Sequence, residues 1–272
     1  MPFLYAGIGV FALILIGFIA YLIALKPGDV KAIEDYKGVC FAHRGLHNSE
    51  RPENSMAAFR AAVDAGYGIE LDIRLSADGE LVVFHDDTLD RVCGRCGRVD
   101  SFTTAELRQF RLCGTEEHIP TLSEVLSLVD GRVPLLIEIK EDVGRLEVST
   151  AAAVFLKDYK GRYIIESFNP FAIQNFKKLY PEIPCGILCE SYIKKPELRR
   201  FSYVLAGAMA TNIVCRPNFI AFNHNHKKSF ALRLARSLYG VPTVAWTVRS
   251  KEESAAAKKA GFDGVIFEDY LE

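Results

Sequence analysis

Short apolar runs alternate along the chain with amphipathic stretches of helical period. The amphipathic stretches predict helices at residues 54–65, 121–129, 146–159, 170–179, 194–209, 227–238 and 250–260. The apolar runs, rich in β-branched residues, predict strands at residues 39–42, 68–73, 134–139, 162–166, 185–189, 219–222, 243–247 and 264–267. Eight strands that alternate with helices are typical of a (β/α)8 TIM barrel, which needs about 250 residues. A doubly wound open sheet is less favoured, because no glycine-rich phosphate turn follows an early strand.

Local signals refine this pattern. Asn54 is placed to cap the first of these helices, while Thr121 and Ser250 each precede a Glu by three residues, as in a capping box. The turn at residues 77–79 predicts a further short strand at 81–84. The stretch 86–120 is longer than a simple strand-to-helix connection, so we expect a short insertion on the barrel.

The N-terminus carries a continuous apolar run over residues 3–25 without a charged residue. As a helix this run is about 34 Å long, which is enough to span a bilayer. A cleaved signal peptide is the alternative, but no basic region precedes the run and no clear cleavage site follows it. We therefore expect a transmembrane anchor at residues 1–25, a juxtamembrane linker at 26–37 and the barrel domain at 38–272.

Charge and cysteine content predict the location and exclude one class of partner. Lys26, Lys31 and Lys37 follow the anchor, so the positive-inside rule favours a cytoplasmic barrel on a single-pass membrane protein. The seven cysteines form no paired framework, which fits a reducing compartment. A formal net charge of −1 and a pI near 6.6 argue against a nucleic-acid-binding surface.

Three carboxylates interrupt two of the apolar strands. Glu70 and Asp72 are two residues apart, so they share one face of their strand, and Glu138 lies near the end of the next barrel strand. Buried carboxylates are costly unless they are paired or bound to a metal. Oxygen ligands of this kind suit Mg²⁺ or Ca²⁺. The alternative for each carboxylate is an ion-pair network at the barrel rim with Arg44, Arg74 and Lys140.

Two histidines accompany these carboxylates at predicted strand ends. His43 follows the strand at 39–42, and His85 follows the short strand at 81–84. Acid–base hydrolysis of a stable ester needs one group that takes a proton and another that gives one. Arg44 and Lys140 add positive charge where a phosphoryl oxygen gains negative charge, so the set indicates a phosphate ester as substrate.

The motifs that contain these residues resemble the glycerophosphodiester phosphodiesterase family. The resemblance covers about residues 38–267 and is most specific in the first third. It rests on the segments Ala42-His43-Arg44-Gly45, Pro52-Glu53-Asn54-Ser55, Glu70-Leu71-Asp72-Ile73-Arg74, His85-Asp86, Leu89-Asp90-Arg91, Glu138-Ile139-Lys140, Glu166-Ser167-Phe168-Asn169 and Trp246-Thr247-Val248.

The resemblance implies a (β/α)8 barrel that hydrolyses glycerophosphodiesters to glycerol 3-phosphate and an alcohol. It implies His43 and His85 as the acid–base pair, and a hydroxyl of the glycerol or a water as the attacking group. It also implies that a divalent cation is bound by Glu70, Asp72 and Glu138. The phosphate would be contacted by Arg44 and Lys140, and the pocket would be lined by Glu166, Phe168 and Trp246.

Two segments depart from the family pattern. After the last strand, Glu268-Asp269-Tyr270 stands where family members commonly carry an Asp or Asn turn followed by Arg-Pro, so a phosphate contact there is in doubt. Cys93 and Cys96 form a C-x-x-C pair without a second pair at suitable spacing, which favours two loop thiols over half a zinc site.

Two alternative functions stay open at this stage. One is the same chemistry on a lysophospholipid, in the manner of a phospholipase D, which a membrane anchor makes reasonable. The other is a catalytically inactive, membrane-tethered binding protein on the same scaffold. The two histidines and three carboxylates argue against the second, because a binding module needs no acid–base pair.

Overall fold

Eight parallel strands close into a barrel in the computed structural model, which describes residues 2–190 and 201–272. Each barrel strand pairs with the next along the chain, and the last pairs with the first, so this sheet has no open edge. The predicted TIM barrel and its eight strands are therefore confirmed. The strands are β1 (Cys40–Ala42), β2 (Gly68–Leu75), β4 (Leu135–Ile139), β5 (Tyr163–Ser167), β6 (Cys185–Cys189), β7 (Phe219–Asn223), β8 (Thr243–Val248) and β9 (Gly264–Phe267).

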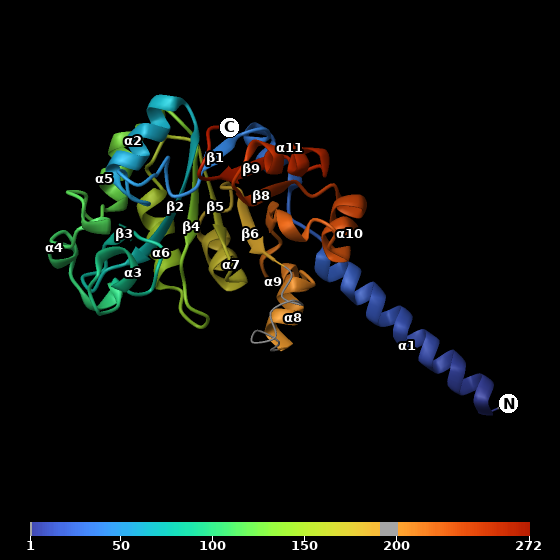
Figure 1. Cartoon of the computed structure of the whole chain (residues 1–272). Helices are drawn as coiled ribbons and strands as arrows, with labels where there is room; N and C mark the ends of the chain where they lie inside the picture. Colours follow the sequence, from blue (N-terminus) through green and yellow to red (C-terminus); the bar gives the residue numbers. More distant parts are fainter. Residues whose placement is uncertain (1, 191–200) are drawn as a thin grey trace.

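Helices cover the outside of the barrel (Figure 1). Residues 194–200 of the helix predicted at 194–209 lie outside the described residues, and α9 is a short helix that the sequence did not predict. The helices are α2 (Met56–Ala65), α5 (Leu122–Val129), α6 (Glu147–Leu156), α7 (Pro170–Leu179), α8 (Phe201–Gly207), α9 (Asn212–Cys215), α10 (Phe230–Tyr239) and α11 (Lys251–Lys259).

The helix caps agree with the sequence at two of three positions. Thr121 and Ser250 cap α5 and α11, since each hydroxyl accepts a hydrogen bond from the backbone N–H of the Glu three residues on. The predicted cap at Asn54 is wrong, because Ser55 caps α2. Asn54 has a positive φ of 54° and its amide is turned inward to donate to Asp72 at 2.8 Å.

The stretch after β2 forms the predicted insertion. Strand β3 (Leu81–Val83) pairs antiparallel with the far end of β2, and α3 (Asp90–Cys93), η2 (Val99–Ser101), α4 (Thr104–Leu107) and η3 (Leu112–Gly114) follow it. A small apolar cluster that includes Val82, Phe84 and Leu107 holds these pieces together. Cys93 and Cys96 are free thiols here.

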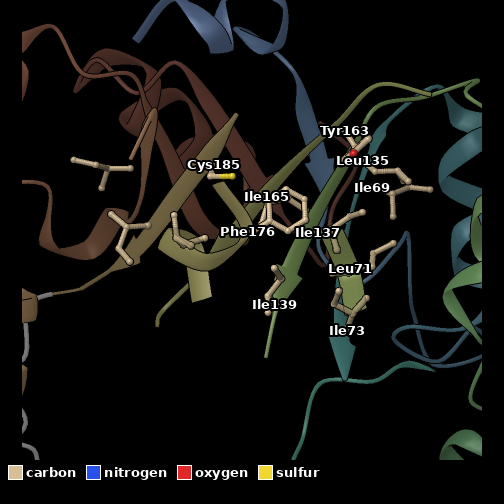
Figure 2. Packing of buried hydrophobic residues seen from close by; sticks show 14 of the residues in the cluster. Ile69, Leu71, Ile73, Leu135, Ile137, Ile139, Tyr163, Ile165, Phe176 and Cys185 are labelled. Carbon is tan, nitrogen blue, oxygen red and sulfur yellow. The ribbon is translucent and has the colours of Figure 1, made fainter. Parts of the chain in front are cut away.

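Alternate residues of each barrel strand pack on opposite sides. Leu71, Ile73, Ile137 and Ile139 point outward to the helices, and Phe176 of α7 packs in the same layer (Figure 2). Their neighbours point into the barrel, where a second apolar cluster fills the interior. Glu70, Asp72, Glu138 and Glu166 lie on the same strand face as this second cluster, so they add polar groups to it at the C-terminal ends of the strands. The cluster contains Ile33, Phe41, Leu136, Ile164, Leu188, Phe219, Ala221, Val244 and Ile266.

Helix α1 (Pro2–Leu25) projects away from the barrel (Figure 1). Its segment Tyr5–Leu25 is long and apolar enough to cross a membrane, and only 11% of its most apolar window is buried against the protein. After it, η1 (Val30–Tyr36) lies at the N-terminal ends of the strands, where the Tyr36 hydroxyl donates to the Tyr163 carbonyl at 2.9 Å. The cytoplasmic position of the barrel stays a prediction from the lysines beside α1.

Packing inside the barrel generates a stability prediction at Gly186. This glycine of β6 is in register with Phe219 of β7, and a Cβ built on it would lie 2.3 Å from the Phe219 ring. We expect Gly186→Ala to lower the free energy of unfolding by about 1–3 kcal/mol through overpacking. Urea unfolding of the full chain in one detergent measures it.

Phe219→Leu is the control, because it replaces the clashing ring with a smaller side chain. In the Phe219→Leu background, Gly186→Ala should cost clearly less than it does alone, because the clashing ring is gone. Equal costs in the two backgrounds would contradict the assignment.

Candidate active site

Strand register brings the predicted carboxylates into one row at the mouth of the barrel. Asp72 of β2 is in register with Glu138 of β4, and Glu138 is in register with Glu166 of β5. Glu70 lies two residues before Asp72 on the same strand face. Residues that are far apart in the sequence therefore present four carboxylates to one small volume.

A pocket of about 170 Å³ opens beside this row. Its floor is apolar, from Leu188 and Ile266, and its rim carries an edge-to-face ring pair, Phe168 with Trp246, whose centroids are 5.7 Å apart. All of the predicted site residues except Asp72 line it; these are His43, Arg44, Glu70, His85, Glu138, Lys140, Glu166, Phe168 and Trp246.

Three of the carboxylates form a compact group of acidic oxygens. One oxygen each from Glu70, Glu138 and Glu166 lies within 4.8 Å of the others, and all three side chains are buried. Burial, together with neighbouring carboxylates, raises the pKa of Glu70 and Glu166 well above the usual value. Burial also raises the pKa of Glu138, to about 7, although Lys140 opposes it. When all three are ionised, this trio would carry more negative charge than its surroundings offset, which is why its carboxyls tend to retain protons.

Asp72 has a different environment from the trio. It is fully buried, and its carboxylate contacts Lys140 Nζ at 3.0 Å, Arg44 Nε at 3.5 Å and the amide of Asn54 at 2.8 Å. Although burial alone would raise its pKa, these cations and the Asn54 amide hold it far below the usual value. Asp72 is therefore an anion that organises the two cations beside the pocket.

The rim ion-pair network that the sequence left open is present in part. Lys140 contacts Glu138 at 2.7 Å as well as Asp72. Glu70 instead accepts a hydrogen bond from the backbone N–H of Arg44 at 2.8 Å. Arg74 lies outside the carboxylate row, where its guanidinium donates to the backbone carbonyl of His85 at 2.7 Å.

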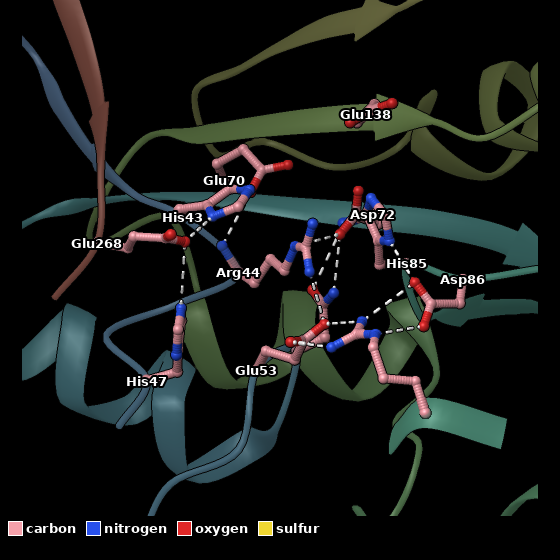
Figure 3. A network of polar contacts seen from close by, with 12 residues as sticks. His43, Arg44, His47, Glu53, Glu70, Asp72, His85, Asp86, Glu138 and Glu268 are labelled. Atoms are coloured by element: carbon pink, nitrogen blue, oxygen red, sulfur yellow. Dashed lines mark hydrogen bonds and ion pairs between the residues drawn. The ribbon is translucent and has the colours of Figure 1, made fainter. Parts of the chain in front are cut away.

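Glu268 holds the imidazole of His43 from behind (Figure 3). Its carboxylate bonds directly to Nδ1 of His43, receives Arg249 at 2.5 Å and lies 3.7 Å from Nε2 of His47. Nε2 of His43 lies 4.0 Å from Glu70. The sequence by itself identified the segment after β9 only as a departure from the family pattern and assigned no role to His47. It did not reveal the contacts of Glu268 with these histidines, because no local pattern shows that this segment returns to the first strand.

His85 has a matching carboxylate on its outer side. Its Nδ1 lies 2.6 Å from Asp86, Arg91 bonds to both Asp86 and Glu53, and Glu53 bonds to Arg44 at 2.7 Å (Figure 3). This chain ties the loop after β3 to the loop after β1. The motifs contained all of these residues, but their mutual contacts follow only from the fold.

The two imidazoles are alike in their electrostatics. Burial lowers the pKa of both, and each carboxylate partner offsets part of this effect. Because Nδ1 of each ring contacts a carboxylate, Nε2 is the atom left for proton exchange with a bound molecule. The site therefore combines two imidazole bases that are oriented by carboxylates, a group of acidic oxygens and the cations Arg44 and Lys140. This combination suits hydrolysis of an anionic ester.

Comparison with known proteins gives one consistent result. The model of the glycerophosphoryl diester phosphodiesterase family matches residues 43–271. A glycerophosphodiester phosphodiesterase of Caldanaerobacter subterraneus subsp. tengcongensis is 34% identical over 249 residues, covering 86% of this chain and 95% of that protein. A putative glycerophosphodiester phosphodiesterase of Bacillus subtilis is 30% identical and covers 83% of this chain and 92% of that protein.

Solved structures agree with the sequence relatives. A phosphodiesterase of Oleispira antarctica, solved in complex with the product sn-glycerol-3-phosphate, aligns with a TM-score of 0.71 at 25% identity, covering 86% of this chain and 94% of that one. A glycerophosphodiester phosphodiesterase of Thermotoga maritima aligns with a TM-score of 0.65 at 26% identity, covering 85% and 94%.

The contact between Glu268 and His43 generates a prediction about protonation. Glu268→Gln should lower the pKa of His43 further, because it removes the negative charge that stabilises the protonated imidazole against burial. The transition from charged to neutral His43 therefore moves to lower pH. Titration of the histidine ring signals by NMR measures this shift.

His85 is the internal control, since its carboxylate partner is Asp86 and its titration should change little. A His43 titration that stays in place or moves to higher pH in Glu268→Gln would rule out this role for Glu268.

Proposed function

Because the chain belongs to the glycerophosphoryl diester phosphodiesterase family, we propose that it hydrolyses glycerophosphodiesters to glycerol 3-phosphate and an alcohol, with His43 and His85 as the acid–base pair. The observation that carries this proposal is the position of both imidazoles on the wall of one pocket that also contains Lys140 and the carboxylate trio. A binding protein would have no use for two histidines that are each oriented by a carboxylate.

The carboxylate trio supports a requirement for a divalent cation. Glu70, Glu138 and Glu166 are buried, repel one another and have raised pKa values, and one oxygen of Glu166 is buried without a hydrogen-bond partner. Mg²⁺ or Ca²⁺ satisfies an all-oxygen site of this kind. We propose Glu70 and Glu138 as ligands, because they belong both to the predicted set with Asp72 and to the compact group with Glu166.

A bound cation supplies a Lewis acid that polarises a phosphoryl oxygen. The protein's own cations complete the recognition of the phosphate. Lys140 and Arg44 line the pocket and are held in place by Asp72, so their charges are already oriented before a substrate enters. Phe168 and Trp246 offer ring faces and edges to the glycerol or to the alcohol group beside it.

Acid–base exchange is assigned to the Nε2 atoms of the two histidines. One imidazole takes the proton of the attacking hydroxyl, from the glycerol or from water, and the other gives a proton to the leaving alkoxide. Burial lowers the pKa of both rings, so the neutral form that acts as a base persists to lower pH. The ring that acts as the acid must therefore take up a proton, from solvent or from the other ring.

Chelation tests the cation. We expect EDTA to abolish hydrolysis of glycerophosphocholine by the full chain, and Mg²⁺ or Ca²⁺ to restore it. Since burial raises the pKa of Glu138 to about 7, a cation must displace a proton below this pH, so half-maximal recovery should need more cation at pH 6 than at pH 8. The assay measures hydrolysis of the phosphodiester as the amount of choline released.

Activity that EDTA leaves unchanged would contradict the cation requirement. Running the same assay on lysophosphatidylcholine separates the two substrate classes. Choline and glycerol 3-phosphate released from glycerophosphocholine indicate a small water-soluble diester as substrate, whereas choline and lysophosphatidic acid released from lysophosphatidylcholine indicate a phospholipase D type of reaction.

Substitution tests the histidines. His43→Ala and His85→Ala should each lower kcat by about 10²–10⁴-fold, because each removes one partner of the proton transfer. His118→Ala is the matched control, since His118 lies outside the pocket, in the insertion. Full activity in either pocket variant, with an unchanged circular dichroism spectrum, would overturn the acid–base assignment.

A further inference from the structure

The end of α1 packs directly against the barrel. Leu25, at the end of α1, is 1% exposed and belongs to the main apolar core. The Tyr21 hydroxyl donates to the carbonyl of Ala208 at 3.0 Å, and the Tyr239 hydroxyl of α10 donates to the carbonyl of Leu22 at 2.7 Å. Arg216, which follows α9, donates to the carbonyl of Ile23 in α1 at 2.7 Å and to that of Lys26, just after α1, at 2.8 Å. These contacts hold the end of the apolar helix directly against the barrel domain.

The mouth of the barrel and α1 point to the same side of the molecule. Successive outward residues of β2 and β4, from Ile69 to Ile73 and from Leu135 to Ile139, descend toward the lower side in Figure 2. In Figure 1 the loop that follows the C-terminal end of β4 extends to the lower side of that view, as does helix α8, and α1 runs from its junction to the lower right. If α1 spans a bilayer, that bilayer would therefore lie on the side of the pocket opening.

Exposed apolar side chains connect the mouth to α1. They occur on successive barrel elements: the loop after β4, the start of α7 after β5, then α8 and α9, the last of which contacts α1. Single exposed apolar residues are common on protein surfaces and need no explanation. These, however, continue the apolar surface of α1 along one side of the mouth. We name them the apolar belt: Val143 (81% exposed), Leu146 (42%), Phe171 (48%), Val204 (57%) and Ile213 (50%).

We propose that the apolar belt rests in the interfacial layer of the bilayer that α1 spans, which turns the pocket opening toward lipid head groups. Burial of apolar side chains at the boundary between head groups and acyl chains is favourable, by about 25 cal/mol for each Å² removed from water. Because α1 already fixes the barrel beside the membrane, the belt adds this burial without a further cost of association. The phosphodiesters that reach the pocket then come from the membrane surface.

Fluorescence quenching tests this contact in the full chain. Tryptophan is introduced singly at Phe171, Val204 and Ile213, and each variant is reconstituted into liposomes with or without brominated acyl chains. We expect the added emission of these variants to fall by about twofold in brominated lipid, because an interfacial indole lies close to the acyl chains. The native Trp246 supplies a common background that is subtracted with the parent protein.

Two further variants make every outcome decisive. Val154→Trp is the matched negative control, because Val154 is 70% exposed on α6, away from α1. Phe11→Trp reports whether α1 itself is embedded. Quenching at the belt and at position 11, but not at 154, supports the proposal. Quenching at position 11 alone shows that the barrel stands clear of the bilayer, and absence of quenching at position 11 removes the membrane; either result overturns it.

The readout is independent of the reaction. A protein without phosphodiesterase activity can still show quenching at the belt, and an active one can lack it. Failure of this inference is therefore distinguishable from failure of the proposed function.

Discussion

The structure depends most on the concentration of negative charge inside the barrel mouth. Glu70, Asp72, Glu138 and Glu166 are buried on three neighbouring strands, where water cannot screen them. Lys140 and the side chain of Arg44 neutralise Asp72, and the remaining carboxylates keep raised pKa values. This imbalance makes the site suited to a divalent cation, and the register of the parallel strands holds the carboxylates together.

The catalytic arrangement is supported by carboxylates outside the pocket. Glu268 and Asp86 each contact Nδ1 of one histidine, and each is itself held by an arginine. Both carboxylates therefore counteract the effect of burial on an imidazole and fix its orientation. Since Arg91 also reaches Glu53, which in turn holds Arg44, one chain of ion pairs connects the orientation of His85 to that of Arg44.

The apolar helix and the pocket are also related through the fold. The loop after β4 extends to the side toward which α1 runs, so the geometry that gathers the pocket residues at the C-terminal strand ends also sets which way the pocket opens relative to α1. Leu25 is buried at the junction and two tyrosine hydroxyls donate to carbonyls across it, so the position of α1 relative to the barrel is fixed by direct contacts. An anchor on a flexible linker would restrict position alone.

The sequence by itself determined the barrel and most of the pocket lining. Strand period and strand-end position are local properties, so His43, Glu70, Glu138 and Lys140 could be identified from their neighbours in the chain. Tertiary structure alone decided the partners. Glu268 meets His43 because β9 closes the barrel against β1, and Glu166 joins Glu70 and Glu138 through strand register. Asp72 contacts Lys140, and Asn54 donates to Asp72 instead of capping the helix as predicted. Both contacts join segments that are distant in the sequence and meet only when the barrel closes, so no local pattern predicts them.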